Sequence, residues 1–355
     1  MASRRRTPAE TSVDERLSEY LTRMPTLSQQ YQPSVFWERQ LGSLRSSSSF
    51  SKGASLSAED LEALVRSLGY GFEDLQEDAA SASSDERFAS ARRNADRIGR
   101  LAKGFRPKAL GLPPDEWEHA AALRFLDRHE ALEEYVALLD RLDVRSSMSV
   151  ARHFWYQRQV RALAAEHVAA RSLDIIEIGA GAGNLAVMLH MFGLVRCYVI
   201  VDLPELLVHS AYTLSKYIPG VDLRFEAPLA ADAAPRSPVF SLLTPAQASL
   251  LPDDSADVAL NYNSFMEMDR EARDAYLELV YRVGRPGALF LNVNRRQRAL
   301  PGRDGESFDN NPLLYPYRRS DRVLLWEEDE FQTVTRMRPG RLSSLAIVRA
   351  ALLVG

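Results

Sequence analysis

The sequence contains almost no cysteine and no long apolar run, and each absence excludes a class of protein. Its 355 residues include a single cysteine, Cys197, so the chain has neither an internal disulfide framework nor a cysteine-ligated zinc site. No stretch reaches membrane-spanning length, and the basic start MASRRRTPAE is followed by polar residues rather than by the apolar core of a signal peptide. We therefore expect a cytoplasmic protein with no membrane partner.

A strong charge of either sign is also missing. The formal net charge is −4, with 26% charged and 46% hydrophobic residues, which is ordinary for a globular protein. This composition gives no reason to expect nucleic-acid binding. Asp253, Asp254 and Asp257 are clustered, but their Pro and Ser neighbours are typical of a solvated turn. We expect no nucleic-acid partner and no metal site.

The patterns that are present divide the chain into three parts. Residues 1–12 are predicted to be a disordered tail, 13–148 a helical N-terminal domain, and 149–355 an α/β domain in which short apolar strands alternate with amphipathic helices. Helical spacing predicts helices over 115–142 and 149–170, among others. For the third strand of the sheet, the sequence favours 239–243 over 221–225. Residues 322–326 and 343–353 are predicted to form a terminal antiparallel hairpin.

A glycine-rich stretch, DIIEIGAGAGN, occupies residues 174–184. An apolar β-branched run brackets Glu177 and ends at three alternating glycines, after which apolar residues recur at helical spacing. Glycine is favoured at such a strand-to-helix turn where the backbone needs a positive φ or passes close to a ligand. A dinucleotide fingerprint, G-x-G-x-x-G, would require glycine at position 184, which is Asn184.

The observed spacing, E-x-G-x-G-x-G, resembles motif I of the class I S-adenosylmethionine-dependent methyltransferases. The next strand, CYVIVD, ends in Asp202, which is placed to accept hydrogen bonds from both ribose hydroxyls, a device that dinucleotide enzymes share. The stretches EIGAGAGN, VDLPE, NSFMEM and FLNVNR further resemble the sugar O-methyltransferases of secondary-metabolite and glycan pathways. The resemblance is strongest over residues 173–295. It implies a Rossmann-like sheet of seven strands with a terminal antiparallel hairpin, and S-adenosyl-L-methionine as the cofactor.

Ligands of open α/β sheets lie outside the carboxyl ends of the strands, near the switch in strand order. This rule and the resemblance together predict a set of cofactor-binding residues: Glu177, Gly179, Ala180, Gly181, Gly183, Asn184, Asp202, Leu203, Gln247 and Asn261. Glu267 is the first candidate for the catalytic base and His153 the second, since a buried carboxylate or a histidine can accept a proton at neutral pH. The alternatives are a capping or ion-pair role for Glu267 and a packing role for His153.

The acceptor is less well determined by the sequence. Residues 153–156, HFWY, either line an acceptor site or only pack the helical region onto the sheet. Arginines after the fifth strand, Arg295 and Arg296 among them, either form a solvated face or bind a substrate phosphate. We expect an O-methyltransferase that acts on a hydroxyl of a small molecule, namely a sugar or glycosylated metabolite. A polyketide or phenolic acceptor, and a catalytically inactive binding subunit, are the alternatives.

Overall fold

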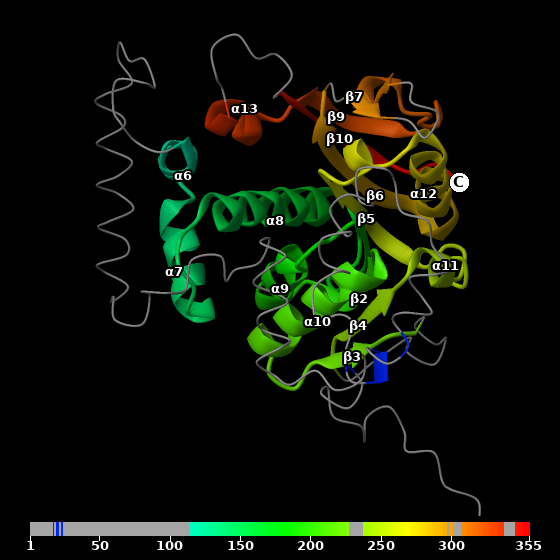
Figure 1. The fold of residues 1–355 in the computed structure, drawn as a ribbon, viewed down its shortest axis with the longest axis horizontal. Coiled ribbons are helices and arrows are strands. Elements are labelled where there is room, and N and C mark those ends of the chain that lie inside the picture. Colours follow the sequence, from blue (N-terminus) through cyan, green and yellow to red (C-terminus); the bar gives the residue numbers. More distant parts are fainter. Residues whose placement is uncertain are drawn as a thin grey trace, which may run out of the picture.

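The fold is shown in Figure 1, drawn from a computed structural model. The structure describes Leu17, Glu19, Tyr20 and Arg23, and then residues 114–226, 237–296, 299–301, 307–336 and 345–355. The predicted tail lies outside these residues. So does most of the predicted helical N-terminal domain.

One eight-stranded sheet forms the centre of the described chain, in the order β3-β4-β2-β1-β5-β6-β10-β9. The strands from β3 to β6 in this order run parallel to their neighbours, whereas β10 is antiparallel to both β6 and β9. The sheet is thus mostly parallel with a terminal antiparallel pair, as predicted. The strands are β1 (Leu173–Ile178), β2 (Val195–Val201), β3 (Asp222–Arg224), β4 (Val239–Leu243), β5 (Ala256–Tyr262), β6 (Gly284–Arg295), β9 (Arg322–Glu328) and β10 (Ala346–Leu352). A separate two-stranded sheet pairs β7 (Ala299–Pro301) with β8 (Ser307–Asp309).

The sheet has one strand more than the seven that were expected. The sequence favoured residues 239–243 over 221–225 as the third strand, and the structure contains both, as β4 and β3. Strand β3 is only three residues long and pairs on one side with β4. A short edge strand needs only one partner and little apolar patterning, which is why the local pattern was ambiguous.

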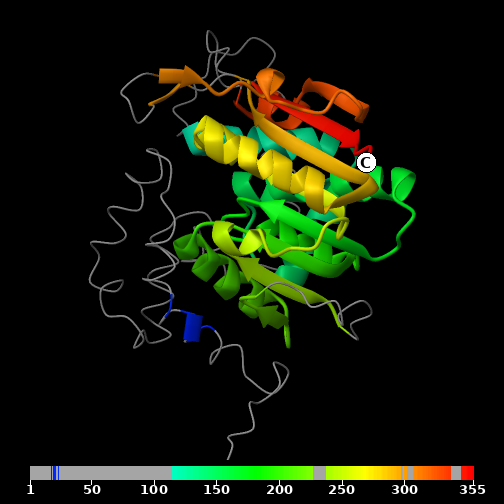
Figure 2. The ribbon, with the colours of Figure 1, turned by 90° about the vertical axis from the view of Figure 1, so that its right-hand side faces the viewer.

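Side chains along β1 point alternately to the two faces of the sheet, and helices cover both faces. Leu173 and Ile175 belong to the core on one face, with residues of α8 (Met148–His167), α9 (Asn184–Met191) and α10 (Pro204–Tyr217). Ile176 and Ile178 belong to the core on the other face, under α11 (Pro245–Ala248) and α12 (Arg270–Val283). Figure 2 shows α12, in yellow, lying over its face of the sheet.

The first core continues without a break into the helices that precede the sheet. The predicted helix over 115–142 is two helices, α6 (Pro114–Arg128) and α7 (Leu132–Leu142), because Glu130 adopts a left-handed conformation with φ 52°. Helix α8 matches its prediction closely and begins at Ser147, whose hydroxyl accepts from the Val150 amide at 3.1 Å. Helix α13 (Glu330–Arg336), between β9 and β10, packs on α6 and α8.

Candidate functional site

The carboxyl ends of the parallel strands meet at one edge of the sheet, and the strand order reverses at β1, between β2 and β5. The glycine turn lies at this point. Gly179, Gly181 and Gly183 all have positive φ, at 74°, 58° and 75°. This conformation is easily reached only by glycine, and Gly183 is also the residue that caps α9. The turn therefore directs the start of α9 toward the edge where ligands of such sheets bind.

The three glycines differ in what a side chain would meet. A Cβ on Gly179 would lie 2.2 Å from the Ser264 hydroxyl, and one on Gly183 would lie 3.4 Å from Ser210 on α10. A Cβ on Gly181 would meet nothing within 4 Å. Packing therefore excludes a side chain at Gly179, whereas one at Gly183 would make ordinary contacts and the middle glycine borders open space at the ligand edge.

Asp202, directly after β2, holds the turn from the neighbouring strand. Its Oδ2 accepts from the Gly181 amide at 2.8 Å, and its Oδ1 accepts from the Leu203 amide at 2.8 Å. Burial raises the pKa of Asp202 to about 7, with further contributions from the carboxylates of Glu267 and Glu205, although the two amide bonds oppose the rise. Each carboxylate oxygen retains a lone pair for a ligand hydroxyl.

Glu177, inside β1, is the second buried carboxylate of the edge. It is 3% exposed and accepts from the Tyr198 hydroxyl at 2.6 Å. Burial raises the pKa of Glu177 to about 7, and the nearby charge of Asp202 adds to the rise. Sequence reasoning did not identify Tyr198, because its partner lies on another strand. Two neighbouring carboxylates therefore share this edge, and their charge is most stable beside a positively charged ligand.

Glu267 lies on a short 3₁₀ turn, η5 (Phe265–Glu267), just after β5. Three asparagines from separate segments hold this turn. The Phe265 amide donates to Asn261 at 3.3 Å, and the Met266 amide donates to Asn294 at 2.9 Å. Asn310 donates to the Phe265 and Met268 carbonyls at 2.7 and 3.0 Å. The half-buried Glu267 is thus carried on a fixed backbone, and its charge contributes to the raised pKa of Asp202.

Asn261, predicted to contact the cofactor, also ties the strands together. Its amide donates to the Ile178 carbonyl at 2.9 Å, and its oxygen accepts from Asn294 at 2.8 Å. Ser264 donates to the same Ile178 carbonyl at 2.9 Å. Asn261 therefore fixes the end of β1 against the turn that carries Glu267. A contact between Asn261 and the cofactor stays a prediction.

The remaining predicted cofactor residues surround the same edge. Ala180 is half-buried in the glycine turn, Leu203 follows Asp202, and Asn184 is the buried first residue of α9. Gln247 lies on α11, where it completes a capping box with Thr244 and donates to the Phe225 carbonyl at 3.0 Å. The structure brings all of these residues to the carboxyl edge. Their contacts with a cofactor stay predictions.

His153 lies in the first half of α8. Its Nδ1 donates to the Ser149 carbonyl at 2.8 Å. Burial, and then the charge of Arg152, lower the pKa of His153 to about 3, so its ring is neutral near pH 7 and is a weak base. These features favour packing over proton transfer for His153, and Glu267 stays the first candidate for the base.

The aromatic residues that follow His153 join the helices to the sheet. The Trp155 ring packs edge-on against Phe125 of α6, with centroids 4.7 Å apart. Tyr156 is fully buried, stacks on Tyr262 at the end of β5 with centroids 4.2 Å apart, and accepts from Gln332 of α13 at 2.6 Å. These contacts favour the packing interpretation for the segment. They also bring α8 and α13 to the carboxyl end of β5.

Two polar atoms in this packing have no partner. The Tyr262 hydroxyl and Gln332 Oε1 are buried and lack a hydrogen bond within the part of the chain that the structure describes. Buried polar groups without partners are rare in proteins and mark positions where a ligand or water can bind. Next to them, Asn263 has a φ of 59°, an uncommon left-handed conformation for a residue with a side chain.

The described residues contain no group of three or more His, Cys, Asp or Glu side chains that could hold a metal ion. None of their helices is long and apolar enough to cross a membrane. Of the arginines after β6, Arg296 lies 3.5 Å from Glu328 in an exposed ion pair.

No protein-family model matches the chain, and no curated protein sequence matches it. Solved structures do resemble it. One is the Burkholderia thailandensis 1,6-didemethyltoxoflavin-N1-methyltransferase with bound S-adenosylhomocysteine, at 14% identity and a TM-score of 0.36, covering 78% of this chain and 93% of that one. Another is the N-methyltransferase NodS from Bradyrhizobium japonicum WM9, at 9% identity and 0.36, covering 56% and 86%. A third is the (4+2) cyclase SpnF, at 15% identity and 0.37, covering 59% and 83%. Likenesses this distant do not determine a reaction.

Proposed function

We propose that the chain is a methyltransferase that binds S-adenosylmethionine at the carboxyl edge of its sheet. The observation that carries the proposal is the turn from Glu177 to Gly183. Its three glycines all have positive φ, and Gly181 borders open space while its amide is held by Asp202. The backbone conformation already calls for glycine at Gly181, and the open space beside it leaves room for a ligand next to the amide that Asp202 holds.

The residues at this edge fit the chemistry of the cofactor. S-adenosylmethionine carries a positive sulfonium, an amino acid group and a ribose. Glu177 and Asp202 are buried carboxylates, and neither has a basic side chain as a hydrogen-bond partner among the described residues. A cationic ligand beside them compensates the cost of burying their charge. Asp202 also has lone pairs for the ribose hydroxyls.

When bound, the cofactor supplies a methyl group whose transfer breaks the bond to the sulfonium sulfur and leaves a neutral thioether. Catalysis then requires that the acceptor oxygen be aligned and that its proton be removed. We assign the removal of this proton to Glu267, because η5 begins three residues after the last residue of β5, at the switch point, and three asparagines hold its backbone. The oxygen gains the methyl carbon as its proton passes to the Glu267 carboxylate.

The acceptor that we propose is a hydroxyl of a sugar or of a glycosylated metabolite. The support is the resemblance of the stretches around Asn184, Asp202 and Glu267 to sugar O-methyltransferases, together with the polar character of the nearby packing. The Tyr262 hydroxyl, at the end of β5, and Gln332 Oε1, on α13, both lack a hydrogen-bond partner among the described residues. Both can form hydrogen bonds with acceptor hydroxyls.

The test is transfer of a deuterated methyl group from labelled S-adenosylmethionine to a panel of nucleotide sugars, glycosides, polyketides and phenols, read by mass spectrometry. We expect one labelled methyl on a sugar-containing acceptor. Transfer to a polyketide or phenol alone would correct the acceptor class and keep the reaction. The methyltransferase proposal would be wrong if no acceptor gained a methyl and calorimetry detected no binding of S-adenosylhomocysteine.

A further inference from the structure

A row of buried polar side chains crosses the face of the sheet that α12 covers. Asn261 of β5 pairs with Asn292 of β6, and Asn292 pairs with Arg349 of β10. Arg349 in turn pairs with Trp326 of the edge strand β9. Asn292 lies two residues after Phe290, which belongs to the core under α12, so alternation puts the row on that face. Both asparagines are fully buried and the arginine is 2% exposed, and groups buried in this way need hydrogen-bond partners.

Hydrogen bonds join this row to η5, the turn that carries the candidate base. The Asn292 amide donates to the Tyr317 hydroxyl at 2.5 Å, and its oxygen accepts from Asn294 at 2.6 Å. Asn294 also donates to Asn261 at 2.8 Å, and its oxygen accepts from the Met266 amide of η5 at 2.9 Å. Asn292 and Asn294 thus form an asparagine relay from Tyr317 to the backbone of η5.

The far end of the asparagine relay is anchored by a buried ion pair. Tyr317 lies between β8 and β9, and the guanidinium carbon of Arg349 is 4.0 Å from the centre of its ring. Arg349 donates to Asp321 at 2.7 Å, and their side chains are 2% and 0% exposed. The Tyr281 hydroxyl of α12 donates to the same carboxylate oxygen at 2.8 Å. Tyr317 is therefore held by β10 and α12, and its place does not depend on η5.

The asparagine relay transmits a direction as well as a contact. Each side-chain amide has a donor end and an acceptor end, so a partner at one end determines what the other end offers. Because Asn292 directs its nitrogen to Tyr317, its oxygen faces Asn294. Asn294 uses its nitrogen on two asparagine oxygens, which leaves its own oxygen for the Met266 amide. Apolar side chains of the same size would fill this space, but they could not orient a backbone donor.

We propose that Tyr317 is a positioning residue for Glu267, which it holds in place through the asparagine relay and the backbone of η5. This inference rests on the proposed function, in which Glu267 removes the proton of the acceptor. Proton removal requires the carboxylate within hydrogen-bond reach of the acceptor oxygen, so a small displacement of η5 lowers the rate. The two relay asparagines make no hydrogen bond to the glycine turn or to Asp202 among the described residues. Loss of the relay should therefore slow methyl transfer without weakening cofactor binding.

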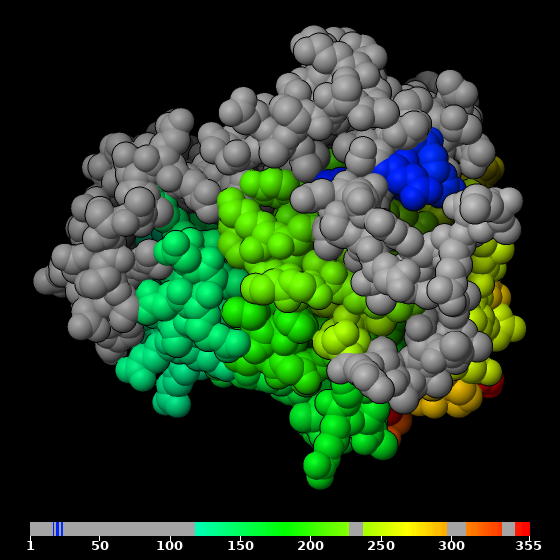
Figure 3. Space-filling model, turned by 90° about the horizontal axis from the view of Figure 1, so that it is seen from below, coloured from blue at the N-terminus to red at the C-terminus, as the bar shows by residue number. Residues whose placement is uncertain are grey.

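The experiment uses the full chain and compares wild type with Tyr317→Phe, Asn292→Leu and the double variant that carries both substitutions. Phenylalanine keeps the ring beside Arg349 and removes only the hydroxyl. The matched control is Tyr135→Phe on α7, which removes a buried hydroxyl that bonds to Ser146 at 2.9 Å. Figure 3 shows the blue-green residues of α6 and α7 on the opposite side of the molecule from the orange and red residues near the C-terminus.

Four measurements are made on each variant. Hydrogen–deuterium exchange of residues 263–268, read by mass spectrometry, measures how firmly η5 is held. Unfolding in urea measures stability, and calorimetry measures the affinity for S-adenosylhomocysteine. Turnover is measured as transfer of a deuterated methyl group to the acceptor that gains the label with the wild type.

We expect the η5 amides to exchange about 3- to 10-fold faster in all three relay variants, which is the factor for loss of one hydrogen bond. Turnover should fall by about 10- to 100-fold while affinity for S-adenosylhomocysteine stays within about twofold. Each single variant leaves a buried polar group without its partner and should be less stable. The double variant removes both partners and should regain stability but not turnover, whereas Tyr135→Phe should lower stability alone.

Unchanged exchange of η5 in Tyr317→Phe and Asn292→Leu would overturn the inference, because the relay would then not hold the turn. It is also overturned if the double variant regains turnover together with stability, or if Tyr135→Phe lowers turnover as much. Either result would mean that the Tyr317 hydroxyl only stabilises the fold. If the wild type methylates no acceptor, the proposed function itself fails, and the inference fails with it whatever the exchange shows.

Discussion

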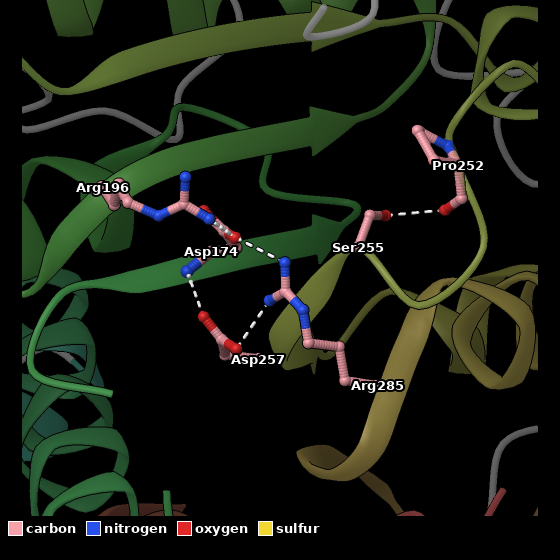
Figure 4. A network of polar contacts seen from close by, with 6 residues as sticks. All are labelled: Asp174, Arg196, Pro252, Ser255, Asp257 and Arg285. Atoms are coloured by element: carbon pink, nitrogen blue, oxygen red, sulfur yellow. Dashed lines mark hydrogen bonds and ion pairs between the residues drawn. The ribbon is translucent and has the colours of Figure 1, made fainter. Parts of the chain in front are cut away.

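Carboxylates at the amino ends of the parallel strands (the amino edge) have different partners from those at the carboxyl ends (the carboxyl edge). At the amino edge, shown in Figure 4, Asp174 and Asp257 share Arg285, whose two terminal nitrogens donate to them at 2.9 and 2.6 Å. Arg196 forms a second ion pair with Asp174, and the Asp174 amide donates to Asp257 at 2.9 Å. The negative charge at this edge is balanced by arginines of the same chain.

At the carboxyl edge, Glu177 and Asp202 have no arginine or lysine as a hydrogen-bond or ion-pair partner among the described residues. Glu177 accepts from a tyrosine hydroxyl and Asp202 from two backbone amides, and burial raises the pKa of both to about 7. Internal ion pairs need no partner from outside, whereas buried carboxylates without them are stabilised by protonation or by a cationic ligand. We therefore propose a structural role for the amino edge and a binding role for the carboxyl edge.

The largest effect is expected from Gly181→Val. A branched side chain there enters the open space beside Asp202 and also strains a backbone with φ 58°, so binding of S-adenosylhomocysteine should be lost in calorimetry. Gly193→Val is the matched control, because Gly193 also has a positive φ of 71° and open space, but follows α9 at the amino edge. Equal loss of binding in both variants would show that backbone strain, not the ligand edge, is responsible.

A smaller but still large effect is expected from Glu267→Gln. Loss of a general base typically lowers turnover by about 10²- to 10⁴-fold. Affinity for S-adenosylhomocysteine should stay near that of wild type, because the asparagine contacts to the backbone of η5 do not involve the side chain. Glu271→Gln, an exposed residue of α12, serves as the control. Normal turnover in Glu267→Gln would remove this residue as the base.

The carboxyl edge was easier to predict from sequence than the way it is assembled. The glycine spacing and the acidic end of β2 are local patterns, and the structure places Gly181 and Asp202 in direct contact. The support of η5 depends on Asn294 and Asn310, which come from β6 and from beyond β8, and no local pattern pairs side chains so far apart. The contact of Tyr317 with Asn292 escaped prediction for the same reason.

At the amino edge, Arg285→Ala should reduce stability without affecting binding. The substitution leaves Asp257 without an ion pair among the described residues and Asp174 with Arg196 alone, and their side chains are 15% and 9% exposed. We expect a loss of about 1–3 kcal/mol in the free energy of unfolding, measured in urea. The control is Arg319→Ala, which is exposed. A change in ligand affinity in Arg285→Ala larger than about twofold would contradict the separation of roles.

The smallest expected effect is a pH dependence of stability and of ligand affinity that arises from the carboxylates of the carboxyl edge. The pKa of Glu177 is raised to about 7, so its folded form binds a proton that the unfolded chain, with an ordinary glutamate, has released. The contribution of Glu177 to the stability of the ligand-free protein is therefore highest below about pH 4. This contribution falls as the pH rises toward 7 and is constant above pH 7. A cationic ligand requires the ionised carboxylate, so its affinity changes in the opposite direction and rises over the same range.

For one group with a pKa near 7, the ionised fraction increases about tenfold between pH 6 and pH 8, so binding of S-adenosylmethionine should strengthen by up to about that factor. Calorimetry at the two pH values measures this change, and repetition in buffers of different ionisation enthalpy measures the proton released. Glu177→Gln should flatten the profile, and Asp202, whose pKa is also about 7, should account for what remains. Arg285→Ala should leave it unchanged, because that arginine contacts only the amino edge. A flat profile in the wild type would mean that both carboxylates are already ionised at pH 6, and the contrast between the two edges would then be one of geometry and not of charge.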